Sequence, residues 1–171
     1  MMRRDHAITG LPEQWTKLWT KLWSWYAISV ALILLTAGVA KSIGIQQSAA
    51  FLSKPNSIIT LFSNRHLFWG ISILEIGVGA LLLTRVLTLL KKMKTIFWIS
   101  SQFAIYRIGL WLISEPEPCK CFGDLFRWIG ASDDFIRAIT IVSLMYMLIP
   151  SGMFWVFSIT KAFSKKFGGT A

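Results

Sequence analysis

The sequence predicts an all-α fold, an integral membrane four-helix bundle with a short interfacial helix at its N-terminus. Of the 171 residues, 54% are hydrophobic and only 15% are charged, whereas about a quarter of the residues in soluble domains are charged. Four apolar stretches are each about as long as the roughly 20 residues that cross a bilayer. The basic residues cluster beside these stretches. We therefore expect lipid to surround the protein.

The first predicted element is a tryptophan-rich amphipathic helix. Residues 15–23 read WTKLWTKLW, which places the Trp and Leu side chains on one helical face and the Thr and Lys side chains on the other. Tryptophan favours the headgroup region, and lysine is attracted to anionic lipid. We expect residues 1–23 to form a cytoplasmic segment whose helix lies on the membrane surface.

Four membrane spans follow this segment. They are expected at Ser24–Gly44, Leu67–Leu87, Thr95–Ser114 and Phe135–Phe157. Residues 24–158 then form the membrane domain, and residues 159–171 form a basic cytoplasmic tail. A cleaved signal peptide is the alternative for the first span, but its apolar stretch begins late and exceeds the usual length of such signals. Pro150 lies within the last span and is expected to bend it.

The distribution of charge predicts the orientation. Lysine and arginine gather in the N-terminal segment, in the loop between the second and third spans, and in the tail, which places these regions in the cytoplasm. The loop between the third and fourth spans holds five of the eight acidic residues and is expected outside. The net charge of +10 does not indicate a nucleic-acid partner, because no basic stretch alternates with base-stacking aromatic residues.

Cys119 and Cys121 lie in this acidic loop, after two prolines that end the third span. Cysteines two residues apart in an extended chain have Cα atoms about 6.6 Å apart, near the upper limit for a disulfide. Such a bridge would be strained, and strained, exposed disulfides are the reactive ones. The pattern favours thiol–disulfide exchange. A structural or intermolecular disulfide and binding of a soft metal ion such as Cu(I) are the alternatives.

Several residues around the cysteines are candidates for supporting roles. His66, at the outer end of the second span, is a candidate proton donor or a merely solvated side chain. Ser132 and Asp133 are candidate N-caps of the fourth span. The residues expected to shape a docking surface for a protein partner are Phe122, Gly123, Leu125 and Trp128.

Lys41, Glu75 and Arg107 lie inside apolar spans, where ionisable side chains are rare and tend to be functional. At 1.5 Å per residue, Glu75 lies about 12 Å and Arg107 about 10 Å from the outer ends of their spans. We expect a buried Glu75–Arg107 pair with Lys41 close by, beneath the cysteine loop, which Tyr106 and Gln102 either join or pack against. A polar lock that fixes the bundle geometry is the alternative to a functional role. Small residues that would let these helices approach closely are Ala37, Gly38, Ser72 and Gly79.

These features together resemble the MauE/DoxX group of redox-associated membrane proteins, over roughly residues 24–158. The matching positions are Ala37-Gly38-Val39-Ala40-Lys41, Glu75 and Cys119-Lys120-Cys121-Phe122-Gly123. The resemblance implies a DoxX-like bundle in the bacterial inner membrane, with a redox-active cysteine pair above Lys41 and Glu75. MauE-like proteins are associated with maturation of the disulfide-rich small subunit of methylamine dehydrogenase, beside a thioredoxin-like partner. Some DoxX relatives are tied to quinone chemistry. The tryptophan-rich helix departs from the family pattern.

The sequence thus predicts a membrane component of periplasmic thiol–disulfide handling that supports maturation of a secreted client protein, with a role as a component of a thiol–disulfide oxidoreductase left open. Its expected partners are the bilayer, a thioredoxin-like periplasmic protein and that client. A non-catalytic scaffold or chaperone and a small transporter subunit are the alternative functions. Nucleotide and haem motifs are missing from the sequence, so no bound cofactor or metal is expected, with quinone as the open alternative.

Overall fold

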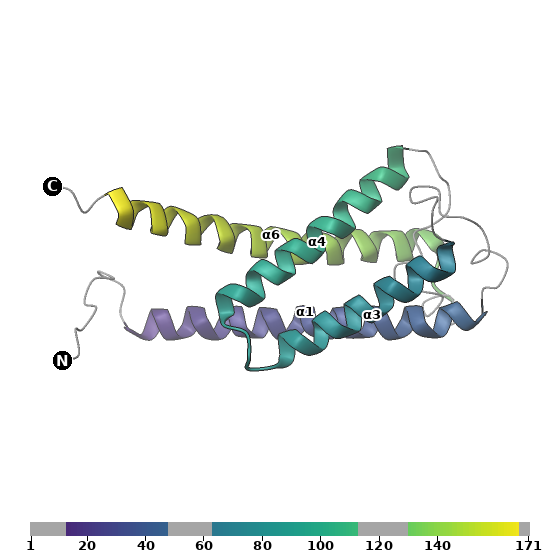
Figure 1. Cartoon of the computed structure of the whole chain (residues 1–171), viewed down its shortest axis with the longest axis horizontal. Coiled ribbons are helices and arrows are strands. Elements are labelled where there is room, and N and C mark those ends of the chain that lie inside the picture. Colours follow the sequence, from purple (N-terminus) through teal and green to yellow (C-terminus); the bar gives the residue numbers. More distant parts are fainter. Residues whose placement is uncertain (1–12, 48–62, 113–129, 168–171) are drawn as a thin grey trace.

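The computed structural model describes residues 13–47, 63–112 and 130–167. These residues form four helices joined into one elongated bundle (Figure 1). The all-α fold class predicted from the sequence is therefore confirmed. The helices are α1 (Glu13–Gln47), α3 (Asn64–Leu83), α4 (Leu89–Leu112) and α6 (Asp133–Phe167).

Three of these helices are long and apolar enough to cross a membrane, namely Lys17–Ile45, Asn64–Leu83 and Asp134–Thr160. The remaining helix, α4, has 24 residues. Its apolar sequence is interrupted by serines, Gln102 and Arg107, which lower its mean hydropathy. Its outer face is nevertheless apolar, since the side chain of Trp98 is 66% exposed and that of Ile105 is 64% exposed. Large apolar side chains facing outward along the bundle indicate contact with lipid. The chain is a membrane protein.

The bundle is built from two helix pairs. α1 packs along α3, and α4 packs along α6. Buried residues of α1 meet residues of α3 and α4 in a common apolar core. This core includes Ala27, Val30, Ala31, Leu34, Leu82, Met93 and Ile96.

The tryptophan-rich repeat differs from its predicted structure. Its residues form the first turns of α1, which runs without a break from Glu13 to Gln47, instead of a separate helix on the membrane surface. Trp23 makes edge-to-face contacts with Tyr26 and Phe154, with ring centroids 5.7 Å and 5.1 Å apart. The contact with Phe154 holds Trp23 against α6, and α1 passes through this position without a break.

The second helix also ends earlier than predicted, at Leu83 instead of Leu87. The backbone N–H and the hydroxyl of Thr84 both donate to the carbonyl oxygen of Leu81, at 3.2 Å and 2.7 Å. The ammonium of Lys92 donates to the carbonyl oxygen of Leu82 at 2.5 Å. These three donors satisfy carbonyl groups that the helix end leaves free, which stabilises a short turn into α4.

Pro150 lies inside α6 and has no N–H to donate to the carbonyl of Tyr146, one turn earlier. A side chain from another helix supplies the missing donor. The hydroxyl of Tyr26, on α1, lies 3.2 Å from the carbonyl oxygen of Tyr146 and 2.8 Å from that of Met147. The proline therefore creates a polar contact that ties α1 to α6.

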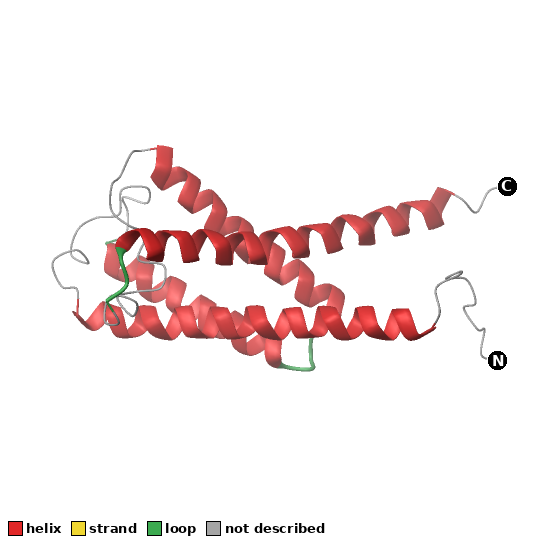
Figure 2. Cartoon of the chain, turned by 180° about the vertical axis from the view of Figure 1, so that it is seen from behind, coloured by secondary structure: helices red, strands yellow, loops and turns green. Residues whose placement is uncertain are grey.

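The path of the chain brings four helix ends together. α1 and α4 finish, and α3 and α6 begin, at the same end of the bundle (Figures 1 and 2). At this end the backbone N–H of Phe135 donates to the hydroxyl of Ser132 at 3.3 Å, which confirms Ser132 as the N-cap of α6. We call this the loop end, because both long connections, residues 48–62 and 113–129, start and finish there.

Candidate functional site

The polar site begins with an ion pair between α1 and α3, towards the loop end. The ammonium of Lys41 lies 2.5 Å and 2.6 Å from the two carboxylate oxygens of Glu75. Both residues are almost fully buried, with 5% and 3% of their surfaces exposed. Because the ammonium reaches both oxygens, each charge is compensated within the protein, as a low-dielectric setting requires.

The close approach of α1 and α3 makes this pair possible. A Cβ atom on Gly38 would lie 2.7 Å from Cγ1 of Ile76 and 3.0 Å from the carbonyl oxygen of Ser72. The hydroxyl of Ser72 donates to the carbonyl oxygen of Gly38 at 2.6 Å and lies 2.6 Å from the hydroxyl of Ser42. Small residues thus let the two backbones touch, and Lys41 meets Glu75 one turn further on.

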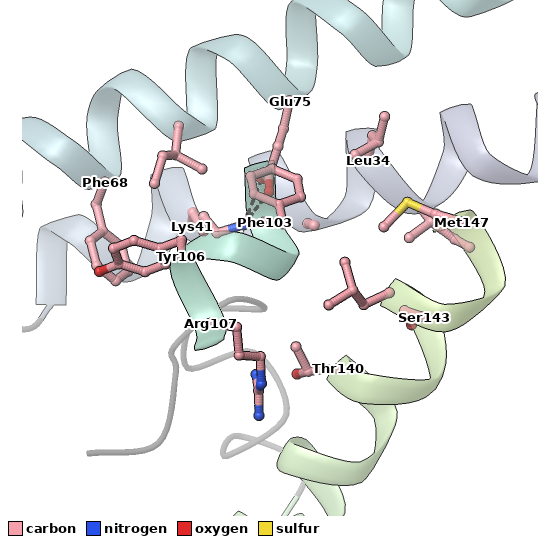
Figure 3. A pocket seen from close by; sticks show the side chains of 14 residues that line it. Leu34, Lys41, Phe68, Glu75, Phe103, Tyr106, Arg107, Thr140, Ser143 and Met147 are labelled. Atoms are coloured by element: carbon pink, nitrogen blue, oxygen red, sulfur yellow. Dashed lines mark hydrogen bonds and ion pairs between the residues drawn. The ribbon is translucent and has the colours of Figure 1, made fainter. Parts of the chain in front are cut away.

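The predicted pairing of Glu75 with Arg107 is wrong. Within the described part of the chain, the carboxylate of Glu75 pairs with Lys41, and Arg107 comes from α4, on the other side of a cavity. Figure 3 shows the guanidinium of Arg107 pointing away from Lys41 and Glu75, towards the side of Thr140. Counting residues along each helix does not predict the direction of a side chain around the helix axis, which is why this pairing was wrong.

Lys41, Glu75 and Arg107 nevertheless line one cavity, which lies among all four helices and has a volume of about 80 Å³. Most of its wall is apolar. The polar side chains in the wall, besides those three, are Tyr106, Thr140 and Ser143. The structure therefore gathers the three ionisable residues around one partly enclosed space (Figure 3).

Arg107 is the unusual member of this group. Its Nη1 atom is buried, and no described residue accepts a hydrogen bond from it. A guanidinium without an acceptor is unfavourable in a low-dielectric region, which marks this position as one that can receive an acceptor from outside the described chain.

The predicted residues outside this cavity have different outcomes. The hydroxyl of Ser63 lies 2.8 Å from Nδ1 of His66, whose side chain is exposed at the start of α3. Gln102 is exposed on α4. The cysteine pair and the predicted docking surface lie outside the described residues, namely Cys119, Cys121, Phe122, Gly123, Leu125 and Trp128.

Two features of the site were not predicted. Thr140 and Ser143, on α6, complete the cavity wall, although hydroxyl residues in an apolar span give no specific signal in the sequence. The link from Tyr26 to the carbonyls before Pro150 is the second, and here the proline itself signals a carbonyl without a donor. Within the described residues, no group of three His, Cys, Asp or Glu side chains is placed to hold a metal ion.

Comparison with known proteins agrees with the resemblance drawn from the cysteine motif and the spans. No curated protein and no solved structure matches the chain. Residues 19–157 match the family described as methylamine utilisation protein MauE. This match includes α3, α4, most of α1 and α6, and both cysteines, and extends over most of the chain. The chain therefore belongs to the MauE family.

Proposed function

We propose that this protein is a component of periplasmic thiol–disulfide handling in the bacterial inner membrane, where it supports maturation of a secreted protein. The observation that carries the proposal is the position of the two helix ends that flank the cysteine-bearing connection. This connection leaves α4 after Leu112 and joins α6 before Asp133, and both helix ends lie at the loop end, above the buried ion pair (Figure 1).

The orientation in this proposal follows from the charges. The connection between α3 and α4 and the two chain ends are basic, so they face the cytoplasm. The loop end, with its acidic connection, then faces the periplasm, where disulfides form and persist. The bundle has an even number of helices, which is consistent with both chain ends on one side.

The proposed reaction is exchange through a mixed disulfide. A thiolate of Cys119 or Cys121 attacks a disulfide of a thioredoxin-like partner, forms a new S–S bond and releases one partner thiolate. The second cysteine then attacks this mixed disulfide and releases the other. The cysteine pair is oxidised and the partner is reduced by the same two electrons, and the reverse sequence oxidises the partner.

The family description supplies a candidate biological setting. Methylamine utilisation points to a client such as the disulfide-rich small subunit of methylamine dehydrogenase, whose cysteines need correct pairing after export. In this proposal the Lys41–Glu75 pair fixes the spacing of α1 and α3 and does not exchange protons or electrons. It thereby holds the loop end in one geometry for a docking partner.

Trapping of mixed disulfides tests this function. Cells expressing Cys119→Ser or Cys121→Ser separately are quenched with acid, and adducts are separated without reduction and identified by mass spectrometry. We expect one variant to accumulate an adduct with a thioredoxin-like protein or a secreted client, because the resolving cysteine is missing. The Cys119→Ser/Cys121→Ser double variant is the control and should give none.

A different result would favour a scaffold. If neither single variant forms an adduct and both support maturation of the client as well as the unchanged protein does, thiol exchange is excluded. The buried ion pair, which locks two helices together, is the observation that fits a purely structural role in assembly.

A further inference from the structure

The cavity at the centre of the bundle combines an apolar wall with one positive charge that the described residues do not compensate. Lys41 and Glu75 neutralise each other by direct contact. Arg107 has a buried nitrogen with no acceptor among the described residues. The described side chains that line the cavity therefore carry a net positive charge, in spite of the carboxylate in the wall.

The apolar part of the wall indicates that a ligand of this cavity would also have an apolar part. Leu34, Ile71, Phe103, Leu144 and Met147 give the cavity a largely hydrocarbon surface. Its volume of about 80 Å³ is several times the space that one water molecule needs. A small hydrated anion could accept a hydrogen bond from the guanidinium of Arg107. It would lose its hydration shell against the apolar wall, however, which disfavours its binding.

We propose that the cavity binds an anionic amphiphile, whose oxyanion head accepts hydrogen bonds from Arg107 and whose hydrocarbon chain enters the cavity between α1, α4 and α6. The head would satisfy the guanidinium nitrogen that the described residues leave unpaired. The chain would replace empty space with dispersion contacts. A free fatty acid and an anionic phospholipid share this chemistry.

Geometry favours entry from the side of Thr140. Arg107 points to that side, and Figure 3 shows its guanidinium below the cavity, away from Glu75 and Lys41. A ligand head at Arg107 would thus lie towards the loop end, near the membrane surface, while its chain extends inwards. A cationic ligand is disfavoured because the carboxylate of Glu75 is already bound by Lys41 through both oxygens.

Photolabelling with a fatty acid that carries a diazirine on its chain tests the proposal. The full-length protein is labelled in phosphatidylcholine nanodiscs, and labelled peptides are mapped by mass spectrometry. We expect saturable labelling of the cavity-lining segments of α4 and α6. Palmitate should compete with the probe, whereas methyl palmitate, which has the same chain but no charge, should compete about tenfold less well or worse.

Two variants and a control make the test specific. Arg107→Gln removes the charge and should reduce labelling about tenfold, and Ser143→Phe should block the cavity without changing any charge. Lys91→Gln, at an exposed lysine on the same helix, is the matched control and should label like the unchanged protein. If Arg107→Gln does not fold, the proposal is still tested by Ser143→Phe and by the comparison of palmitate with methyl palmitate in the unchanged protein.

The outcomes are distinct. Competition by phosphatidylglycerol as strong as by palmitate identifies a phospholipid as the ligand, and competition by palmitate alone identifies a free fatty acid. Equal competition by acid and ester, undiminished labelling of Arg107→Gln, or labelling that does not saturate overturns the proposal. The Cys119→Ser/Cys121→Ser variant should label normally, so this result is independent of thiol exchange.

Discussion

Lys41 and Glu75 form a buried, two-oxygen ion pair that joins α1 to α3, with contacts of 2.5 Å and 2.6 Å. Their positions 34 residues apart in the chain make the pair a tertiary contact. It lies one turn from Gly38, where the two backbones approach closely. The packing of small residues and the pairing of charge are therefore parts of one interface.

Removing one member of this pair should destabilise the protein much more than removing both. Glu75→Gln or Lys41→Met leaves a buried charge alone and should lower the free energy of unfolding by about 3–5 kcal/mol. Lys41→Met/Glu75→Leu replaces the pair with apolar groups, and its free energy of unfolding should be closer to that of the unchanged protein. The stability of all three variants is measured by unfolding in detergent. If the loss of stability in the double variant equals the sum of the losses in the two single variants, direct pairing is contradicted.

The same double variant separates structure from chemistry. Since we assign the pair to positioning, a folded Lys41→Met/Glu75→Leu protein should still form mixed disulfides when combined with the cysteine variant that traps an adduct. Loss of the adduct in protein that unfolds like the unchanged form would instead give the pair a direct part in exchange. Adduct yield per folded molecule is the quantity to compare.

Gly38 should not tolerate a side chain. Gly38→Ala places a methyl group against Ile76 and the backbone of Ser72, and should lower stability by about 1–3 kcal/mol. Gly77→Ala is the matched control, because no atom lies within 4 Å of a Cβ added there. Equal stability of the two variants in thermal unfolding would show that α1 and α3 are not in close backbone contact.

Tyr26 and Pro150 should be energetically coupled. Tyr26→Phe removes the donor to the carbonyls of Tyr146 and Met147 and should cost about 1 kcal/mol. In a Pro150→Ala background, the restored backbone N–H can serve Tyr146, so the same change should cost less. A double-mutant cycle measures this difference, and a coupling energy of zero would mean that the hydroxyl does not replace the missing donor.

The orientation of the bundle can be tested by labelling. After reduction, a membrane-impermeant thiol reagent added to the periplasmic side should label Cys119 and Cys121 in the unchanged protein. In a variant without those cysteines, Thr88→Cys, in the connection between α3 and α4, should be labelled from the cytoplasmic side. Labelling of both positions from the same side would contradict the charge-based orientation.

The sequence by itself determined the all-α class and the four helices of the bundle. Apolar length and charge clustering carry that information, because a bilayer imposes the same length on every span. The cysteine motif and the spans were also enough to identify a resemblance that the family match later supported. The N-cap of α6 at Ser132 was predictable for a local reason, since capping involves neighbouring residues.

The tertiary structure alone decided which charges meet. Depth along a helix follows from counting residues, but the direction of a side chain depends on how each helix turns towards its neighbours. Close packing at Gly38 rotates Lys41 and Glu75 into contact, while Arg107 faces a cavity without a described acceptor. The sequence also predicted a helix on the membrane surface at Trp15–Trp23. In the structure these residues are part of α1, and Trp23 packs against Tyr26 and Phe154.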